Sequence, residues 1–150
     1  MFEKDILKNK VVLITGGGTG LGKSMAMRFA ELGASLVIAS RRKEVISEAA
    51  SQMKEIGAEV LGLQCDVRDT DQVNSMVSDT LNQFDKIDIL INNAAKNPKV
   101  TKNSSGEWFS LIQNNRFETM PREYWDQGLD VILTGNFLVT QIVINKMINQ

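Results

Sequence analysis

Apolar positions in the first ninety residues alternate between two spacings. Short, mostly apolar runs rich in branched side chains occupy residues 11–14, 36–39, 60–64 and 87–91. Such runs are typical of strands that other elements cover on both faces. Between them, apolar residues recur every three or four positions, as on one face of a helix. These helix positions are Leu21, Met25, Phe29 and Leu32, then Val45, Ala49, Met53 and Ile56, and finally Val73, Met76, Val77, Leu81 and Phe84.

Signals for helix ends agree with this alternation. Gly33 and Gly57 follow the first two helical stretches, a common place for glycine. Asp69, with Gln72 three residues later, forms a start for the third that resembles a capping box. Strands separated by helices predict right-handed crossovers and a parallel sheet. We therefore expect one domain over residues 1–150 with a doubly wound, Rossmann-type α/β fold. It should have three layers (α/β/α), strand order three, two, one, four, and be truncated after the fourth strand and its following helix.

The alternation stops after the fourth strand. Residues 96–118 are polar and carry several turn signals, yet they include Trp108, Phe109 and Phe117. A loop of this length is uncommon within a compact domain and is often functional. We expect this insert loop to act as a substrate lid. A small satellite core or an oligomer contact fits the same residues equally well.

Residues 119–150 predict a long helix. Thr119 is a plausible cap, and Pro121 falls in the first turn, where proline is favoured. The helix should continue to the end of the chain, with a break near Leu133 to Gly135. Its apolar residues are too many for one covered stripe, which favours contact with another subunit.

Composition and charge exclude several classes. With a net charge of −1, the chain gives no reason to expect nucleic acid or a membrane surface as a partner. The absence of histidine excludes histidine-based triads and histidine-bound zinc, and we expect no metal. Cys65 is the single cysteine, so it forms no internal disulfide. No apolar run approaches the roughly 20 residues of a membrane helix. The charged opening segment does not look like a signal peptide, so the expected compartment is the cytoplasm.

A glycine-rich segment links the first strand to the first helix. It reads Thr15-Gly16-Gly17-Gly18-Thr19-Gly20-Leu21-Gly22. Glycines allow a tight turn and bring backbone amides close to a pyrophosphate, which then lies at the positive end of the helix. The position between a strand and an amphipathic helix favours dinucleotide binding over a purely structural turn.

Three motifs, in order along the chain, resemble those of the short-chain dehydrogenase/reductase family. The first is the glycine segment, which has that family's Thr-Gly-x-x-x-Gly-x-Gly spacing. The second is Cys65-Asp66-Val67, where the family has an aspartate near the adenine. The third is Asn92-Asn93-Ala94-Ala95, similar to its Asn-Asn-Ala-Gly motif. Taken singly, Asp66 fits a helix cap and Asn92-Asn93 a turn. The implied cofactor-binding residues are Gly16, Gly18, Thr19, Gly20, Leu21, Gly22, Ser40, Arg41, Arg42, Cys65, Asp66, Val67, Asn93, Ala94 and Ala95.

The end of the second strand bears on the choice of cofactor. NAD enzymes usually have an acidic residue there for the ribose hydroxyls, about 20 residues beyond the glycines. This chain has Ser40-Arg41-Arg42 instead. An arginine offers paired donors and a permanent charge to a 2′-phosphate. We therefore expect NADP, with NAD as the alternative; two solvated loop arginines are the non-functional interpretation.

The catalytic residues cannot be assigned within this sequence. The resemblance implies a Ser, Tyr and Lys set whose Tyr-x-x-x-Lys pair follows a fifth strand, beyond Gln150. Tyr124 is the only tyrosine, and Gly128 stands where its lysine should be. Ile132 occupies the place of a fourth catalytic residue, an asparagine of the family's proton relay, and Asn136 is off register with that place. We expect this chain alone to be inactive.

Two branches of the family fit the chain. The glycine segment, residues 37–41, 64–69 and 92–95 look like 2,4-dienoyl-CoA reductases, which also lack the relay asparagine and use NADPH. Residues 96–100 and the insert look more like oxidoreductases of sugars or sugar acids. We favour hydride transfer between NADP(H) and a carbonyl or alcohol of a small, carbohydrate-like substrate. A non-catalytic dinucleotide-binding protein, or an inactive truncated chain, is the alternative from another class.

The sequence also predicts a homo-oligomer. The C-terminal helix resembles the family helix that packs against its copy in a neighbouring subunit, in a dimer or a tetramer. The fourth strand would lie at an exposed sheet edge, which is a template for association.

Overall fold

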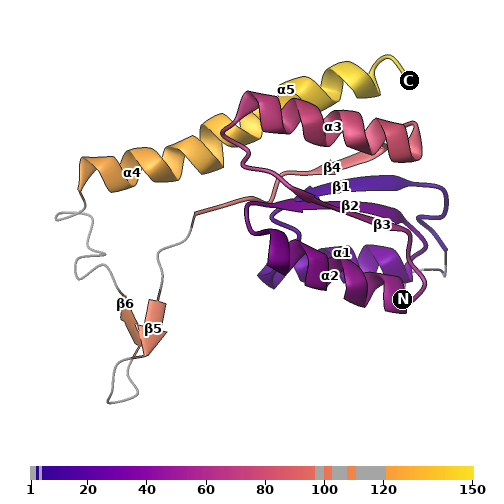
Figure 1. Ribbon diagram of the computed structural model, residues 1–150, viewed down its shortest axis with the longest axis horizontal. Helices are drawn as coiled ribbons and strands as arrows, with labels where there is room; N and C mark the ends of the chain where they lie inside the picture. Colours follow the sequence, from indigo (N-terminus) through magenta and orange to yellow (C-terminus); the bar gives the residue numbers. More distant parts are fainter. Residues whose placement is uncertain (1–2, 4, 97–99, 103–107, 111–120) are drawn as a thin grey trace.

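The computed structural model describes residues 3, 5–96, 100–102, 108–110 and 121–150. Four strands form one parallel sheet in the order β3-β2-β1-β4, which confirms the expected topology. Figure 1 shows α1 and α2 on one face of this sheet, and α3 with the long C-terminal helix on the other. The elements are β1 (Val11–Thr15), α1 (Gly20–Glu31), β2 (Ser35–Ser40), α2 (Lys43–Glu55), β3 (Val60–Gln64), α3 (Thr70–Phe84), β4 (Ile89–Ile91), α4 (Arg122–Leu129), the π-helical segment η2 (Asp130–Gly135) and α5 (Asn136–Met147).

The position of the central strand β1 between two cores explains why its sequence is continuously apolar. All five of its residues are buried. Val12 and Ile14 pack into the apolar core beneath α1 and α2. Val11 and Leu13 pack into the separate core beneath α3 and α5. Since successive side chains of a strand point to opposite faces, a strand covered on both sides needs apolar residues at every position.

The buried face of α2 differs slightly from the predicted one. Ala49 and Met53 are buried as expected, together with Ile46. Val45 instead lies at the edge of the pocket described below. Ile56 is half exposed at the end of the helix. The prediction was wrong at these two positions because the helix is rotated by about one residue so that Ile46 meets β3, where it lies against Gly62.

The long helix has no break. Its segments α4, η2 and α5 follow one another directly, and a π-helical turn occupies the place where a break was predicted. Gly135 brings this turn against the loop after β3, because a Cβ there would lie 2.6 Å from Cγ2 of Val67. Pro121 is the residue just before the helix rather than part of its first turn. Thr119, the predicted cap, lies outside the described residues.

The apolar length of this helix corrects a sequence-based expectation. From Arg122 to Met147 it is long and apolar enough to cross a bilayer by length and composition, although no such segment was expected. The core helix of a globular protein can have the same character, and α5 lies along α3 with Val139 and Val143 fully buried. Only 22% of the most apolar stretch is buried, however. The helix therefore presents a second, uncovered apolar side.

Part of the insert is more regular than expected. Val100–Lys102 (β5) and Trp108–Ser110 (β6) form a two-stranded antiparallel sheet in which Thr101 pairs with Phe109. The sequence had suggested only an irregular loop, because three-residue strands are too short to show an alternating pattern. Phe117 and most of the other insert residues lie outside the described residues. The role of the insert as a lid stays a prediction.

Candidate cofactor-binding site

One pocket, of about 490 Å³, lies at the carboxyl ends of β1, β2, β3 and β4. Carboxyl strand ends are the usual place for a ligand in an open parallel sheet. All of the cofactor-binding residues predicted from the sequence line this pocket. Three further lining residues, Ala39, Val45 and Val131, were not predicted. Ala39 and Val45 lie in stretches that were assigned to the core, and Val131 joins the pocket only because the long helix crosses it.

The glycine segment forms the floor of the pocket, and its glycines have different roles. Gly22 is held tightly, since a Cβ there would lie 2.3 Å from the carbonyl oxygen of Gly16. Gly20 faces open space and has a φ of +53°, a conformation that strongly favours glycine. The hydroxyl of Thr19 makes no capping bond to the first turn of α1. The backbone amides at this helix end therefore face the pocket without a side-chain cap, as a bound pyrophosphate requires.

Residues just after β4 hold the glycine segment in place through hydrogen bonds. The side-chain amide of Asn93 donates to the carbonyl oxygens of Thr15 at 3.1 Å and Gly16 at 3.2 Å. The Thr15 hydroxyl accepts from the backbone amides of Asn93 and Ala94. Asn92 points elsewhere and donates to the hydroxyl of Thr140 on α5 at 2.7 Å. Asn93 thus lines the pocket, but its amide is used to fix the glycine segment.

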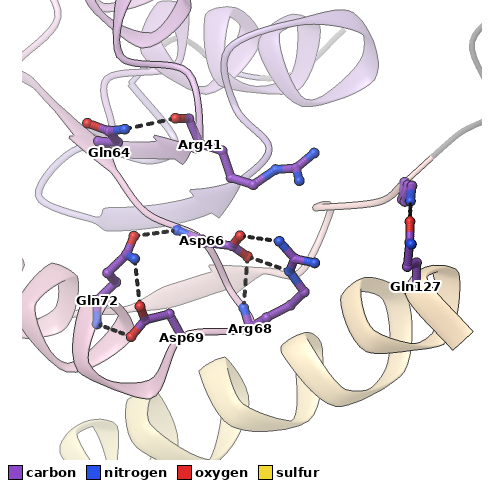
Figure 2. Close-up of polar contacts among 8 residues, drawn as sticks. Arg41, Gln64, Asp66, Arg68, Asp69, Gln72 and Gln127 are labelled. Atoms are coloured by element: carbon purple, nitrogen blue, oxygen red, sulfur yellow. Dashed lines mark hydrogen bonds and ion pairs between the residues drawn. The ribbon is translucent and has the colours of Figure 1, made fainter.

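Arg41 lies at the rim of the pocket beyond β2 and is exposed. Its backbone carbonyl accepts a 3.0 Å hydrogen bond from the side chain of Gln64 at the end of β3. Ser40 accepts from the backbone amide of Arg42 and turns the chain into α2. Backbone contacts therefore hold this rim in place, while the guanidinium of Arg41 extends away from the strand ends (Figure 2).

Asp66 lies in a closed network that the sequence did not predict (Figure 2). Arg68 donates to both of its carboxylate oxygens, from Nε at 2.9 Å and from an Nη at 2.5 Å. The backbone amide of Asp66 donates to Gln72, whose side-chain amide in turn donates to Asp69. The hydrogen bond from Arg68 lowers the pKa of Asp66, although partial burial acts in the opposite direction. This carboxylate is therefore ionised and held in one orientation.

Asp69 is the predicted cap of α3. Its carboxylate accepts from the backbone amides of Asp71 and Gln72, which lowers its pKa. Gln72 departs from the capping-box pattern, because its carbonyl oxygen binds the amide of Asp66 rather than that of Asp69. The helix cap and the Asp66 network are thus one unit. An aspartate and an arginine two residues apart in a turn were the only signal of this network in the sequence.

Cys65 lines the pocket as a buried thiol. It is buried, and burial together with the neighbouring carboxylates of Asp66 and Asp69 raises the pKa of its thiol to about 11. Since the thiolate is the nucleophile, a thiol with this pKa is almost entirely protonated at neutral pH. Its role is that of a small apolar side chain.

The described residues contain no catalytic set around Tyr124. Lys96 lies over the face of its ring, with Nζ 5.0 Å from the ring centre, and donates to the side chain of Gln127. A cation over the ring face stabilises through the ring's π-electrons and does not form a bond to the hydroxyl. Neither residue lines the pocket. This contact ties the first residue of the insert to α4.

Ile132 does not face the sheet. Its side chain is about half exposed on η2. Asn136 follows one turn later and donates to the carbonyl oxygen of Ile132 at 2.8 Å. The carbonyl oxygen of the Asn136 side chain is buried and has no partner among the described residues. Asn136 does not line the pocket, and a role for it in place of the relay asparagine stays untested by this arrangement.

Comparisons with known proteins agree with this geometry. The sequence model for "short chain dehydrogenase" matches residues 10–150. A peroxisomal 2,4-dienoyl-CoA reductase of Arabidopsis thaliana is 41% identical over 96 residues, which are 64% of this chain and 32% of that protein. An NAD-dependent glycerol dehydrogenase of Listeria innocua is 32% identical over 148 residues, 98% of this chain and 51% of that protein. The structure of an NAD⁺-bound xylitol dehydrogenase superposes with a TM-score of 0.82 at 28% identity, covering 97% of this chain and 50% of that one.

This chain spans about half the length of the glycerol and xylitol dehydrogenases that it matches. The matched half contains the four-stranded sheet, the glycine segment and the pocket at the strand ends. From the sequence match and from this arrangement, the chain belongs to the short chain dehydrogenase family.

Proposed function

We propose that this chain is the cofactor-binding part of an NADP(H)-dependent oxidoreductase. The observation that carries the proposal is the pocket, where open glycine backbone and an uncapped helix end face the same space as Arg41. The backbone amides suit a pyrophosphate, and the exposed guanidinium suits a 2′-phosphate. Asp66 and the backbone of Val67 would hold the adenine, and Ala94 and Ala95 border the nicotinamide end.

The bound cofactor would supply the hydride, while these residues bind and orient it. No acidic side chain stands at the end of β2, where NAD enzymes usually hold the ribose hydroxyls. The relatives named above include an NAD-dependent enzyme and an NAD⁺-bound structure. The choice between the two cofactors therefore rests on Arg41.

Binding measurements on this chain test the cofactor assignment. The replacement Arg41→Ala should weaken NADPH binding by about 1.5–3 kcal/mol, the range for hydrogen bonds to charged groups, and leave NADH binding nearly unchanged. The replacement Arg28→Ala is a matched control, because Arg28 is exposed on α1, pairs with Glu31 and does not line the pocket. Equal losses for NADPH and NADH in the Arg41 variant would reject NADP as the preferred cofactor.

For the substrate, we favour a carbonyl or alcohol on a small, carbohydrate-like molecule. The glycerol and xylitol dehydrogenases match almost all of this chain. A second candidate, reduction of a 2,4-dienoyl-CoA, is favoured by the higher identity to the plant reductase over a shorter stretch.

A form of the protein that also carries a Tyr-x-x-x-Lys segment, assayed with NADPH on ketoses and on a dienoyl-CoA, separates the two substrate candidates. The chain of 150 residues should turn over neither substrate, since it has no such pair.

We also propose that the chain self-associates through the uncovered side of the long helix. Leu133, Phe137 and Ile148 are each at least 60% exposed there. Several large apolar side chains exposed along one helix favour a contact with another protein surface. Size-exclusion chromatography with light scattering should show a dimer or larger species, and the paired replacement of Phe137 and Leu133 by serine should shift it toward monomer. A monomer at all concentrations would contradict this proposal.

A further inference from the structure

Two arginines lie near one carboxylate in the pocket region. Arg41 extends from the end of β2, and Arg68 from the turn after β3, where its guanidinium lies against the Asp66 carboxylate (Figure 2). Arg41 and Asp66 both line the pocket. The charge of Arg41 is close enough to contribute to the lowered pKa of Asp66. Asp66 is therefore a possible ion-pair partner for either arginine.

The structure shows that the Asp66 carboxylate pairs with Arg68. Both carboxylate oxygens of Asp66 accept hydrogen bonds from the Arg68 side chain, and one also accepts from the Arg68 backbone amide. Paired hydrogen bonds of this kind are the strongest geometry between a guanidinium and a carboxylate. Among the described residues, the guanidinium of Arg41 makes no hydrogen bond or ion pair. Arg68 thus neutralises the carboxylate that would otherwise attract Arg41.

The position of the turn strengthens this arrangement. The backbone amide of Asp69 donates to the carbonyl oxygen of Asp66, and Gln72 binds the Asp66 backbone amide. These bonds fix Asp66 next to Arg68 independently of any ligand. Asp130, on η2, adds a second negative charge near Arg68. The Arg68 guanidinium is therefore attracted by two carboxylates, of which Asp66 also accepts its hydrogen bonds.

We propose that Arg68 is a specificity-determining residue of the cofactor pocket: by pairing with Asp66 it prevents that carboxylate from pairing with Arg41, and so leaves Arg41 available to a 2′-phosphate. The inference rests on the proposed NADP binding through Arg41. Arg68 acts through Asp66 and has no direct contact with the phosphate. Without Arg68, Asp66 would compete with the 2′-phosphate for Arg41 and would also repel it. A ligand that lacks this phosphate would not be affected by that competition.

Calorimetric titration of this chain with 2′-phospho-ADP-ribose and with ADP-ribose tests the inference without any turnover. The quantity of interest is the ratio of the two dissociation constants. In Arg68→Gln the preference for the 2′-phosphate should fall by roughly three- to fivefold, as expected for partly exposed charges. Adding Asp66→Asn to that variant should restore the preference, because the competing charge is then gone. Arg28→Gln removes an exposed, ion-paired arginine away from the pocket and should leave the ratio unchanged.

The outcomes separate this inference from the proposed function. If the unmodified chain shows no preference, or if Arg41→Ala does not remove it, the NADP assignment fails and the role of Arg68 fails with it. If the preference depends on Arg41 but persists in Arg68→Gln, only the role of Arg68 is overturned. A loss in Arg68→Gln that Asp66→Asn does not restore would also overturn it, since Arg68 would then act on the ligand directly or through the fold.

Discussion

Charged groups pair at both ends of the four-stranded sheet, and the carboxyl end differs in Arg41, which stays out of the Asp66–Arg68 pair. At the amino end, Asp88 accepts from the backbone amide of Val11 at 2.8 Å and pairs with Lys86 at 2.9 Å and Lys10 at 3.4 Å. Lys86 also donates to the carbonyl oxygen of Asn9. At the carboxyl end, the guanidinium of Arg41 has no such partner among the described residues.

This difference distinguishes charges that stabilise the fold from the charge for which we propose a ligand. The Asp88 cluster joins β4 to the start of β1, and only 16% of the Asp88 side chain is exposed. A partly buried carboxylate is stable there because each of its partners is supplied by the chain. Arg41 is exposed, so water can solvate it until an anion binds. The paired charges at the amino end join parts of the fold. At the carboxyl end Arg68 pairs with Asp66 and leaves Arg41 exposed, in agreement with the proposed binding of a 2′-phosphate.

The largest expected effect is a loss of stability when Gly22, in the glycine segment at the carboxyl end of the sheet, is replaced. Gly22→Ala would place a Cβ 2.3 Å from the Gly16 carbonyl oxygen and 2.4 Å from the Asn93 side chain. The floor must then shift, and we expect the free energy of unfolding in urea to fall by about 3 kcal/mol. Gly57→Ala is the matched control, because Gly57 has a positive φ but no atom within 4 Å. It should cost only about 1 kcal/mol. Gly22 has no positive φ, so a loss no larger than that at Gly57 would show that the close approach at Gly22 is relieved at little cost.

A replacement at Gly20 should instead remove binding while the fold persists. Its Cβ position is open, but a valine there would project toward the ligand and resist the positive φ. Such strain costs on the order of 1–3 kcal/mol, which a folded domain can tolerate. We expect Gly20→Val to keep the circular dichroism spectrum of the unmodified chain and to show no NADPH binding. Retained binding in a folded variant would contradict the placement of the pyrophosphate.

At the amino end, Asp88→Ala should destabilise the chain without changing cofactor affinity. The substitution leaves the Val11 amide without its acceptor and Lys86 without its partner, a loss of about 1–3 kcal/mol. Asp126→Ala breaks an exposed pair with Arg122 within α4 and should cost less than about 0.5 kcal/mol. Urea unfolding measures both variants. A change in NADPH affinity in Asp88→Ala would show that the two ends are coupled.

The Asp88 cluster also predicts that the free energy of unfolding depends on pH. The hydrogen bonds from Val11 and the two lysines outweigh burial and lower the pKa of Asp88. The unfolded chain therefore binds its proton first, and the stabilisation is fully present above the ordinary aspartate pKa and is lost as pH falls through the lower folded pKa. Unfolding free energy measured from pH 6 down to pH 3 should decline less steeply in Asp88→Asn than in the unmodified chain. Identical slopes would remove Asp88 as a source of the acid sensitivity.

The smallest effect on cofactor affinity is expected at Cys65, which lines the pocket as a small buried side chain. With a thiol pKa of about 11 and a buried side chain, it should react with a disulfide reagent at neutral pH far more slowly in the folded chain than in urea. Cys65→Ala should leave NADPH affinity nearly unchanged. Rapid labelling of the folded chain would show that this end of the pocket opens in solution.

The sequence by itself determined the fold of residues 11–95 and most of the residues that line the pocket. The local signals are the strand and helix spacings of apolar residues, the glycines that follow helices, and the capping residue Asp69 with Gln72. In this fold these local signals agree with the tertiary structure. Parallel strands bring their carboxyl ends to one edge. Three motifs far apart in sequence, around Gly20, Asp66 and Asn93, therefore had to meet there once the strand order was known.

Only the tertiary structure decided what these residues bind within the chain. Asn93 faces the pocket yet uses its amide on the glycine floor, and Arg68 pairs with Asp66. At the π-helical turn Gly135 lies against Val67, a contact between distant segments. Side-chain partners and helix register depend on the distances between elements, and a pattern read along one chain contains no such distances.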